Sequence, residues 1–261
     1  MKQRPAFPAK LDTAVRARTG AQGAPVAPSA STARVPAVPQ PQGLGMDSTA
    51  VRMNMVQKLR GQGITDAAVL AAMGAIERHR FVDSGLVNQA YEDTSLPIGL
   101  GQTISKPGVV SRMAELMRNG ASGKIGRVLE IGTGCGYQAA VLSLLATEVY
   151  SIERLRGLHD KARDNLRHLR LPNVHLLFGD GMEGYAKGAP YAAIIAAAGG
   201  EAVPQAWVEQ LAVGGRLVAP VVTGTGKGSA QALLVLDKTP QGVRQTLLEP
   251  VHFVPLKSGV A

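Results

Sequence analysis

The run "VLEIGTGCGYQAAVLSLLATEVYSIE", residues 128–153, contains two apolar stretches that are separated by a glycine-rich turn and a helical stretch. This order predicts a buried strand, a tight turn, a helix and a second buried strand that ends in the acid Glu153. Gly132, Gly134 and Gly136 alternate in the turn. Because glycine has no Cβ, such a turn can bend sharply and let a ligand approach the backbone. The stretch therefore predicts a binding site for a ligand that carries a ribose.

Strands and helices continue to alternate after this stretch. Further strands are predicted within 173–181, 191–198, 216–222, 231–238 and 249–256, with helices within 155–171 and 203–215. Such alternation requires a mostly parallel sheet with helices on both faces, because parallel neighbours need a crossover connection. We therefore predict the α/β class: a doubly wound, mostly parallel, Rossmann-like sheet with an N-terminal helical subdomain and late C-terminal strands.

The first part of the chain has a different composition. Residues 23–45, "GAPVAPSASTARVPAVPQPQGLG", are rich in Pro, Ala, Gly and Ser and show no apolar periodicity. Such a segment buries too little apolar surface to offset its ordering entropy, so residues 1–46 are predicted to be a disordered extension. A transit peptide and a true start at Met46 are the alternatives. Residues 47–261 are predicted to fold as one unit, with a helical region and active-site loop over 47–120 and a cofactor-binding α/β region over 121–261.

Composition argues against several classes of protein. The formal net charge is +9, but residues 1–45 hold six basic residues and one acidic residue, so most of the excess lies in the extension. The remainder is weak support for a nucleic-acid partner, and none is expected. No window reaches roughly eighteen uninterrupted apolar residues, so no membrane span is expected. Cys135 is the only cysteine, which rules out an internal disulfide, fits a reducing compartment and makes a metal site unexpected.

The spacing of the glycines separates two classes of cofactor. The dinucleotide fingerprint G-x-G-x-x-G would need its third glycine at Tyr137, whereas here the third glycine is Gly136. The tighter run "EIGTGCG", which begins at Glu130, is typical of S-adenosyl-L-methionine sites, and a nicotinamide dinucleotide is the alternative. Glu153 is expected to accept hydrogen bonds from ribose hydroxyls, or else to be a solvated strand-end acid. Asp180 is expected to accept from an adenine amino group, or else to form a plain Asp-Gly turn.

Five stretches together resemble one enzyme family. They are "GQTISKPGVVSRMAELM" (101–117), "VLEIGTGCGYQAAVLSLL" (128–145), "NVHLLFGDGMEGY" (173–185), "QLAVGGRLVAPV" (210–221) and "VHFVPL" (251–256). The glycine-rich turn is shared by many methyltransferases, whereas "TIS-x-P" and "FVPL" are much more specific. From about residue 50 to residue 257 the chain resembles the protein-L-isoaspartate O-methyltransferases, which repair damaged aspartyl and asparaginyl sites.

The resemblance implies a Rossmann-like methyltransferase fold and a particular reaction. A methyl group of S-adenosyl-L-methionine passes to the α-carboxylate of an L-isoaspartyl residue, leaving S-adenosyl-L-homocysteine, and the ester then cyclises to a succinimide. The implied site residues are Ser105 in catalysis, Val254 and Leu256 at the peptide, and Thr103, Ile104, Glu130, Gly132, Gly134, Gly136, Glu153, Gly179 and Asp180 at the cofactor. Isoaspartyl-containing proteins and peptides are the implied partners, and a cytoplasmic monomer is the implied form.

Elementary chemistry agrees with so sparse a site. A carboxylate with an ordinary pKa of about 4 is already ionised at neutral pH, so the transfer needs no general base. What remains is to align the carboxylate oxygen with the methyl carbon, and positioning supplies on the order of 7 kcal/mol in good cases. We therefore expect Ser105 to orient the acceptor carboxylate through a hydrogen bond. The alternative is that Ser105 caps the helix that begins near Pro107.

Three places depart from the family pattern. Ala192 stands where the family usually has Asp, and His252 stands where many bacterial relatives have Arg. Gly199 and Gly200 replace a stiffer turn after the fourth strand. These changes are expected to weaken cofactor binding or shift substrate preference without changing the fold. Two other functions therefore stay open: a methyltransferase with a small-molecule or nucleic-acid acceptor, and a binding module without catalytic activity.

Overall fold

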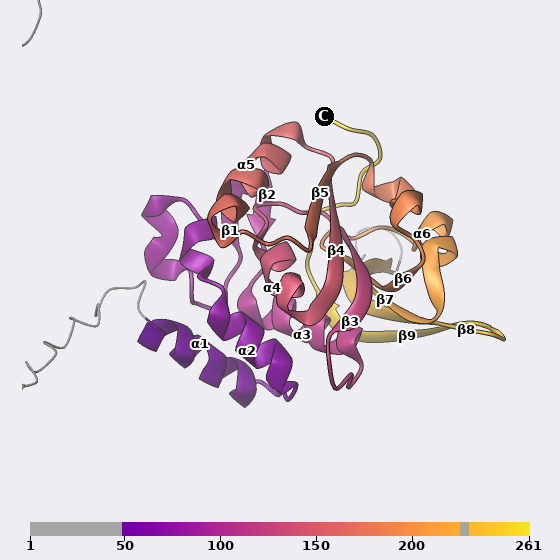
Figure 1. The fold of residues 1–261 in the computed structure, drawn as a ribbon, viewed down its shortest axis with the longest axis horizontal. Helices are drawn as coiled ribbons and strands as arrows, with labels where there is room; N and C mark the ends of the chain where they lie inside the picture. The colour runs from indigo at the N-terminus through magenta and orange to yellow at the C-terminus, as the bar shows by residue number, and fades with distance from the viewer. Residues whose placement is uncertain (1–48, 225–229) are drawn as a thin grey trace, which may run out of the picture. The chain divides into compact units, whose positions relative to one another are not determined.

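The glycine-rich turn follows an inner strand, β3, of a seven-stranded sheet (Figure 1). The computed structural model describes residues 49–224 and 230–261, so the predicted extension over 1–46 lies outside the described residues. The strand order is β5-β4-β3-β6-β7-β8-β9, in which β3 to β7 run parallel and β8 and β9 run antiparallel. The strands are β3 (Ile125–Ile131), β4 (Ala146–Glu153), β5 (Val174–Phe178), β6 (Tyr191–Ala196), β7 (Leu211–Thr223), β8 (Ala230–Thr239) and β9 (Gly242–Val251). The predicted doubly wound, mostly parallel α/β sheet is confirmed.

Helices cover both faces of this sheet. The α-helices in the described ranges are α1 (Thr49–Gly61), α2 (Ala67–Ala75), α3 (Pro107–Arg118), α4 (Tyr137–Leu145), α5 (Arg156–Leu166) and α6 (Gln205–Gln210). Short 3-10 helices are η1 (Arg78–Phe81), η2 (Ser84–Gln89), η3 (Arg167–Leu169), η4 (Gly181–Glu183) and η5 (Ala186–Gly188). Val128 of β3 packs in a cluster with Met113 of α3, whereas the next residue, Leu129, packs in a cluster with Trp207 of α6. Successive strand residues thus bury opposite faces, as a sheet with helices on both sides requires.

The strand order reverses beside β3. The chain runs from β3 to β4 and β5 on one side and then returns to β6 on the other side. In open α/β sheets, ligands bind beyond the carboxyl ends of the strands at such a reversal. The glycine-rich turn lies at this point, directly after Ile131.

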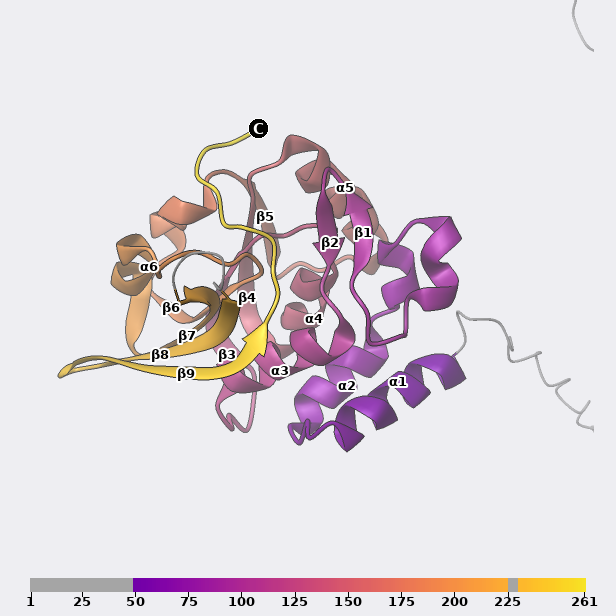
Figure 2. The same cartoon turned by 180° about the vertical axis from the view of Figure 1, so that it is seen from behind.

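The stretch predicted as a loop before α3 contains a small hairpin (Figure 2). Its strands are β1 (Leu96–Gly99) and β2 (Gln102–Ile104), which pair antiparallel. Leu100 and Gly101 form the turn with φ of +51° and +70°. The hairpin gives the segment that contains Thr103 and Ser105 a fixed backbone, instead of leaving it as an irregular loop.

Two predicted elements are shorter than expected. The helix predicted within 203–215 ends at Gln210, because the chain pairs with β6 from Leu211 onward. The strand predicted over 249–256 is wrong in its second half, since β9 ends at Val251. Apart from an isolated bridge at Pro255, residues 252–256 leave the ladder and cross toward the end of β6.

A buried ion pair joins α3 to the start of α2. Arg118, with 3% of its side chain exposed, donates from Nε to Asp66 Oδ2 at 2.7 Å and also donates to the carbonyls of Ala121 and Gly123. The other carboxylate oxygen of Asp66 caps α2 by accepting from the Ala68 and Val69 N–H groups. Burial alone would raise the pKa of Asp66, but Arg118 and the capping N–H groups outweigh it, so the pKa lies below its usual value.

We expect Arg118→Met to lower the free energy of unfolding by about 3 kcal/mol at pH 7, because it leaves the Asp66 carboxylate buried without its cation. Since the pKa of Asp66 is depressed in the folded protein, the stabilisation is present above the unfolded value of about 4 and is lost as the pH falls below it. Urea unfolding at pH 7 and at lower pH measures both effects. Arg167→Met removes an exposed ion pair to Asp164 and is the control; equal losses in the two variants would contradict the prediction.

Candidate active site

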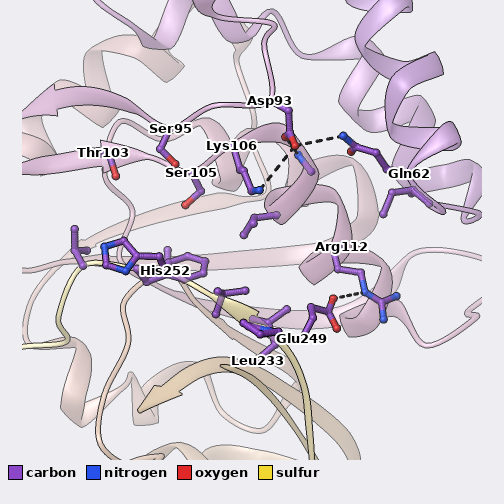
Figure 3. A pocket seen from close by; sticks show the side chains of 18 residues that line it. Gln62, Asp93, Ser95, Thr103, Ser105, Lys106, Arg112, Leu233, Glu249 and His252 are labelled. Atoms are coloured by element: carbon purple, nitrogen blue, oxygen red, sulfur yellow. Dashed lines mark hydrogen bonds and ion pairs between the residues drawn. The ribbon is translucent and has the colours of Figure 1, made fainter. Parts of the chain in front are cut away.

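Two cavities adjoin at the carboxyl ends of β3, β4 and β6. One, of about 430 Å³, is lined by the glycine-rich turn, the end of β4, the β1–β2 hairpin and residues 254–257, and is termed the glycine-loop cavity. The other, of about 840 Å³, is lined by Ser105, the start of α3 and the end of β9, and is termed the Ser105 cavity (Figure 3). Thr103, Ala197 and Val254 line both cavities. A ligand in one cavity can therefore meet a ligand in the other at these three residues.

Backbone geometry explains the alternating glycines. The φ angle is +90° at Gly132, +57° at Gly134 and +90° at Gly136, in the region that strains other residues. Gly132 and Gly134 line the glycine-loop cavity. Gly136 does not line it: a Cβ there would lie 3.1 Å from Leu166 of α5. Gly136 thus allows close packing of the turn against α5, and its predicted cofactor contact stays a prediction.

Glu153 lines the glycine-loop cavity and fixes the turn. Its Oε2 accepts from the Gly134 N–H and its Oε1 accepts from the Leu155 N–H, both at 2.9 Å. The residue is 5% exposed. Each carboxylate oxygen can accept a second hydrogen bond, so the ribose contact predicted for Glu153 fits this arrangement. A solvated strand-end acid does not fit it.

Glu130 lies behind the turn rather than in the cavity. It is fully buried, and Ser151 donates to its Oε2 at 2.5 Å while sharing a hydrogen bond of 2.6 Å with Thr133 of the turn. Burial raises the pKa of Glu130 to about 8, and the nearby charge of Glu153 adds to the rise. The direct cofactor contact predicted for Glu130 is therefore not supported by this geometry. Its connection to the cavity runs through Ser151 and Thr133.

Asp180 forms an Asp-Gly turn, and the adenine contact predicted for it stays a prediction. Its Oδ1 accepts from the Met182 N–H at 2.8 Å, and its Oδ2 accepts from the Gly259 N–H of the C-terminal segment at 2.5 Å. Neither Asp180 nor Gly179 lines the glycine-loop cavity, whereas the next residue, Gly181, does. No sequence pattern predicted that the Gly259 N–H of the C-terminal segment would donate to the Asp180 carboxylate.

The other predicted residues divide between the two cavities. Thr103 and Val254 line both cavities, while Leu256 lines the glycine-loop cavity instead of the predicted peptide groove. Ile104 is buried at 4% exposure and lines neither cavity, because alternate strand residues point in opposite directions. The Ile104 side chain is thus part of the core, and the cofactor contact predicted for this residue stays a prediction.

Ser105 lies in the wall of the larger cavity and does not cap α3. The N-cap residue of α3 is Lys106, whose side chain makes no capping bond. Instead Asp93 Oδ1 accepts from the Gly108 N–H at 2.7 Å and so caps the helix from another segment. In Figure 3 Ser105 and Thr103 lie across the cavity from His252. The Ser105 hydroxyl is therefore left for a ligand rather than for the helix.

Two ion pairs in the Ser105 cavity were missed by sequence reasoning. Asp93 pairs with Lys106 at 3.9 Å, and Arg112 donates from Nε to Glu249 Oε1 at 2.7 Å (Figure 3). Burial raises the pKa of Glu249, but Arg112 outweighs this and holds the pKa below its usual value. No periodicity connects these residues, so only the fold brings them together. Their paired charges make the cavity polar without giving it a strong net charge.

In the described ranges 49–224 and 230–261, no three His, Cys, Asp or Glu side chains gather as metal ligands would. None of the helices in these ranges combines the length and the apolar character needed to cross a bilayer.

The departures from the family pattern have different consequences. Ala192 lies at the amino end of β6, against Gly126, and lines neither cavity, so it gives no reason for weaker cofactor binding. Gly199 leaves room for the Gln231 side chain, because a Cβ at this position would lie 2.6 Å from Gln231 Nε2. His252 is exposed in the Ser105 cavity, so a change of side chain there alters the cavity wall.

The doubly wound sheet, the positive-φ glycines and Glu153 at the end of β4 define the Rossmann-like class of S-adenosyl-L-methionine-dependent methyltransferases. A family model described as "Protein-L-isoaspartate(D-aspartate) O-methyltransferase" matches residues 50–261. The chain belongs to this family. The family, enzyme class and cofactor predicted from the sequence are thereby confirmed.

Individual relatives agree with the family match. The chain is 59% identical to a protein-L-isoaspartate O-methyltransferase of Methylibium petroleiphilum over 221 residues, which cover 84% of this chain and 81% of the relative. It is 54% identical to one of Ralstonia nicotianae over 246 residues, covering 90% and 76%. A solved protein-L-isoaspartate O-methyltransferase superposes with a TM-score of 0.72 at 28% identity, covering 80% of this chain and 67% of that one.

We expect Glu153→Gln to weaken S-adenosyl-L-methionine binding by about tenfold or more. The amide has one acceptor oxygen where the carboxylate has two, so either the Gly134 or the Leu155 N–H loses its partner, and a hydrogen bond to a charged group is worth about 1.5–3 kcal/mol. Isothermal titration calorimetry gives the dissociation constant. Glu209→Gln, on the exposed surface of α6, is the control. An affinity within about twofold of the wild type would remove Glu153 from the binding site.

Glu130→Gln replaces the buried carboxyl group with an amide that does not ionise. Because the folded pKa is raised to about 8, the stability linked to this proton is complete below the unfolded value of about 4.3 and is lost as the pH rises toward 8. The neutral glutamine avoids this loss. We therefore expect similar stabilities near pH 4 and a growing advantage for the variant, by about 1.4 kcal/mol per pH unit, up to pH 8. Urea unfolding across this range tests it; parallel curves would mean that folded Glu130 is already ionised.

Proposed function

We propose that the chain methylates the α-carboxylate of L-isoaspartyl residues, with S-adenosyl-L-methionine in the glycine-loop cavity and the damaged peptide in the Ser105 cavity. The observation that supports this assignment most is the boundary between the cavities at Thr103, Ala197 and Val254. A methyl group has to pass between two ligands that touch, and these residues surround the place of contact. The cofactor supplies a sulfonium, which is an activated methyl donor.

The residues of the glycine-loop cavity fit this cofactor. Gly132 and Gly134 offer backbone without a Cβ, and Glu153 offers two oxygens that can accept from the ribose hydroxyls. A pyrophosphate would instead call for free N–H groups in the turn. The Gly134 N–H already donates to a carboxylate, and a second negative charge beside Glu153 would be repelled. This arrangement favours S-adenosyl-L-methionine over the dinucleotide alternative.

The Ser105 cavity has only to orient the acceptor carboxylate. The acceptor carboxylate is ionised at neutral pH and attacks without a base. Ser105 donates its hydroxyl proton in a hydrogen bond to one carboxylate oxygen and leaves the other oxygen to reach the methyl group. A direct ion pair to a strong cation would make the oxygen a weaker nucleophile. In the cavity Lys106 and Arg112 are paired with Asp93 and Glu249, which limits that effect.

The size and lining of the Ser105 cavity support a peptide acceptor. The cavity has a volume of about 840 Å³ and combines apolar residues such as Phe253 with the two ion pairs. We further propose that the enzyme acts as a cytoplasmic monomer on isoaspartyl proteins and not on nucleic acid. The lone, buried Cys135 is compatible with a reducing compartment. Size-exclusion chromatography with light scattering tests the oligomeric state.

The activity is tested with methyl-labelled S-adenosyl-L-methionine and two matched peptides, one with L-isoaspartate and one with normal L-aspartate. We expect base-labile label on the isoaspartyl peptide alone. Label on another acceptor would favour the methyltransferase of different specificity. Cofactor binding without label on any acceptor would favour the binding module.

In the same assay we expect Ser105→Ala to lower kcat/KM for the isoaspartyl peptide by about ten- to a hundredfold, since it removes one hydrogen bond to a charged oxygen. The affinity for S-adenosyl-L-methionine should stay the same, because Ser105 does not line the glycine-loop cavity. Ser122→Ala, an exposed serine that lines neither cavity, is the control. Unchanged turnover in Ser105→Ala would leave Ser105 without a role in orienting the acceptor.

A further inference from the structure

Residues 252–256 form the wall of the site opposite the β1–β2 hairpin. His252 lines the Ser105 cavity, Pro255 lines the glycine-loop cavity, and Val254 between them lines both. The segment follows β9 but is not part of it. Its backbone therefore needs partners outside the regular ladder to hold a fixed position.

Gln231 supplies such partners from β8. The β8–β9 ladder has its last pair at Gln231 and Val251. The Gln231 side chain also binds Phe253, which is two residues after Val251. Its Oε1 accepts from the Phe253 N–H at 2.7 Å and its Nε2 donates to the Phe253 carbonyl at 3.2 Å. One side-chain amide thus satisfies both polar groups of one residue, as a neighbouring strand would. The Phe253 ring is 7% exposed in the core, so this residue is fixed at three points.

Gly199 completes the same unit. Its N–H donates to the Val254 carbonyl at 2.9 Å, and its carbonyl accepts from the Leu256 N–H at 2.8 Å. A Cβ on Gly199 would lie 2.6 Å from Gln231 Nε2 and 2.9 Å from Gln231 Cδ. The absent side chain leaves the space that the Gln231 amide fills. The structural effect of having glycine at position 199 therefore depends on the Gln231 side chain.

We propose that Gln231 is a positioning residue for methyl transfer. It lines neither cavity, yet it holds Phe253, and through it His252 and Val254, at a set distance from Ser105 and Thr103 across the site. The inference rests on the proposed function, because it assigns the Ser105 cavity to the acceptor. Residues 254–256 are also held by Gly199, so the acceptor side of the wall depends more on Gln231 than the cofactor side does.

A double-mutant cycle with Gln231→Ala and Gly199→Ala tests this coupling. Gln231→Ala removes both hydrogen bonds, and Gly199→Ala pushes the amide out of its place. Two hydrogen bonds of about 1 kcal/mol each correspond to more than a tenfold change, so each single variant is expected to raise KM for the isoaspartyl peptide about tenfold. When Gln231→Ala is also present, the methyl group introduced by Gly199→Ala has no amide to displace. The double variant is expected to show no larger effect than the larger single one.

Two further measurements separate positioning from general damage. Amide hydrogen exchange at Phe253 should be faster in both single variants, and the dissociation constant for S-adenosyl-L-methionine should stay within about twofold. Gln245→Ala, an exposed glutamine of β9, is the matched control and should leave KM unchanged. An unchanged KM in Gln231→Ala, additive effects in the double variant, or an equal loss of cofactor and peptide affinity would each overturn the proposal.

The wild-type enzyme, assayed alongside, distinguishes this failure from that of the proposed function. If it does not methylate the isoaspartyl peptide, the assignment of the Ser105 cavity fails, and with it the positioning role that rests on that cavity. Exchange at Phe253 would then show only whether the Gln231 contact itself exists. If the wild type is active while Gln231→Ala has the same KM, only the positioning role is wrong.

Discussion

The site depends on the hydrogen bonds by which Glu153 joins the ends of two neighbouring strands. Its two oxygens hold the Gly134 N–H of the glycine-rich turn and the Leu155 N–H before α5. Without an acceptor these part-buried N–H groups would each cost free energy, so the turn would relax away from β4. The positive φ angles of the glycines then make the bend without strain. One carboxylate thereby fixes the floor of the glycine-loop cavity.

The walls above this floor come from segments that precede and follow the main sheet in the sequence. The β1–β2 hairpin contributes Thr103 before the first strand of the main sheet, and the segment after β9 contributes Val254. Each wall is held by a side chain from elsewhere: Asp93 caps α3 beside Ser105, and Gln231 holds Phe253. Neither supporting residue is a catalytic one. The chemistry needs little beyond alignment, so the supports of the walls matter as much as the walls.

Sequence patterns predicted the parts of the site that are formed by residues close together in the sequence. The strand–turn–helix–strand unit, the alternating glycines and the position of Glu153 at the end of β4 follow from periodicity and from the spacing within one short stretch. The end of β9 at Val251, the burial of Glu130 and the capture of Asp180 by Gly259 were not predicted. Each of these depends on a contact between segments that are distant in sequence. Adjacent residues carry no trace of such a contact, so pattern reasoning assigned each residue its commonest role.

The same limit applies to the departures from the family pattern. Ala192 looked harmful because a charged residue was missing, yet it lies at the amino end of β6, away from both cavities. Gly199 looked like a loosened turn, yet its missing Cβ is the space in which the Gln231 amide reaches Phe253. A substitution at one position has a physical meaning only together with the atoms that fill or leave its space. Gly199 and Gln231 therefore form one structural unit, in which a larger residue at either position forces the other to move.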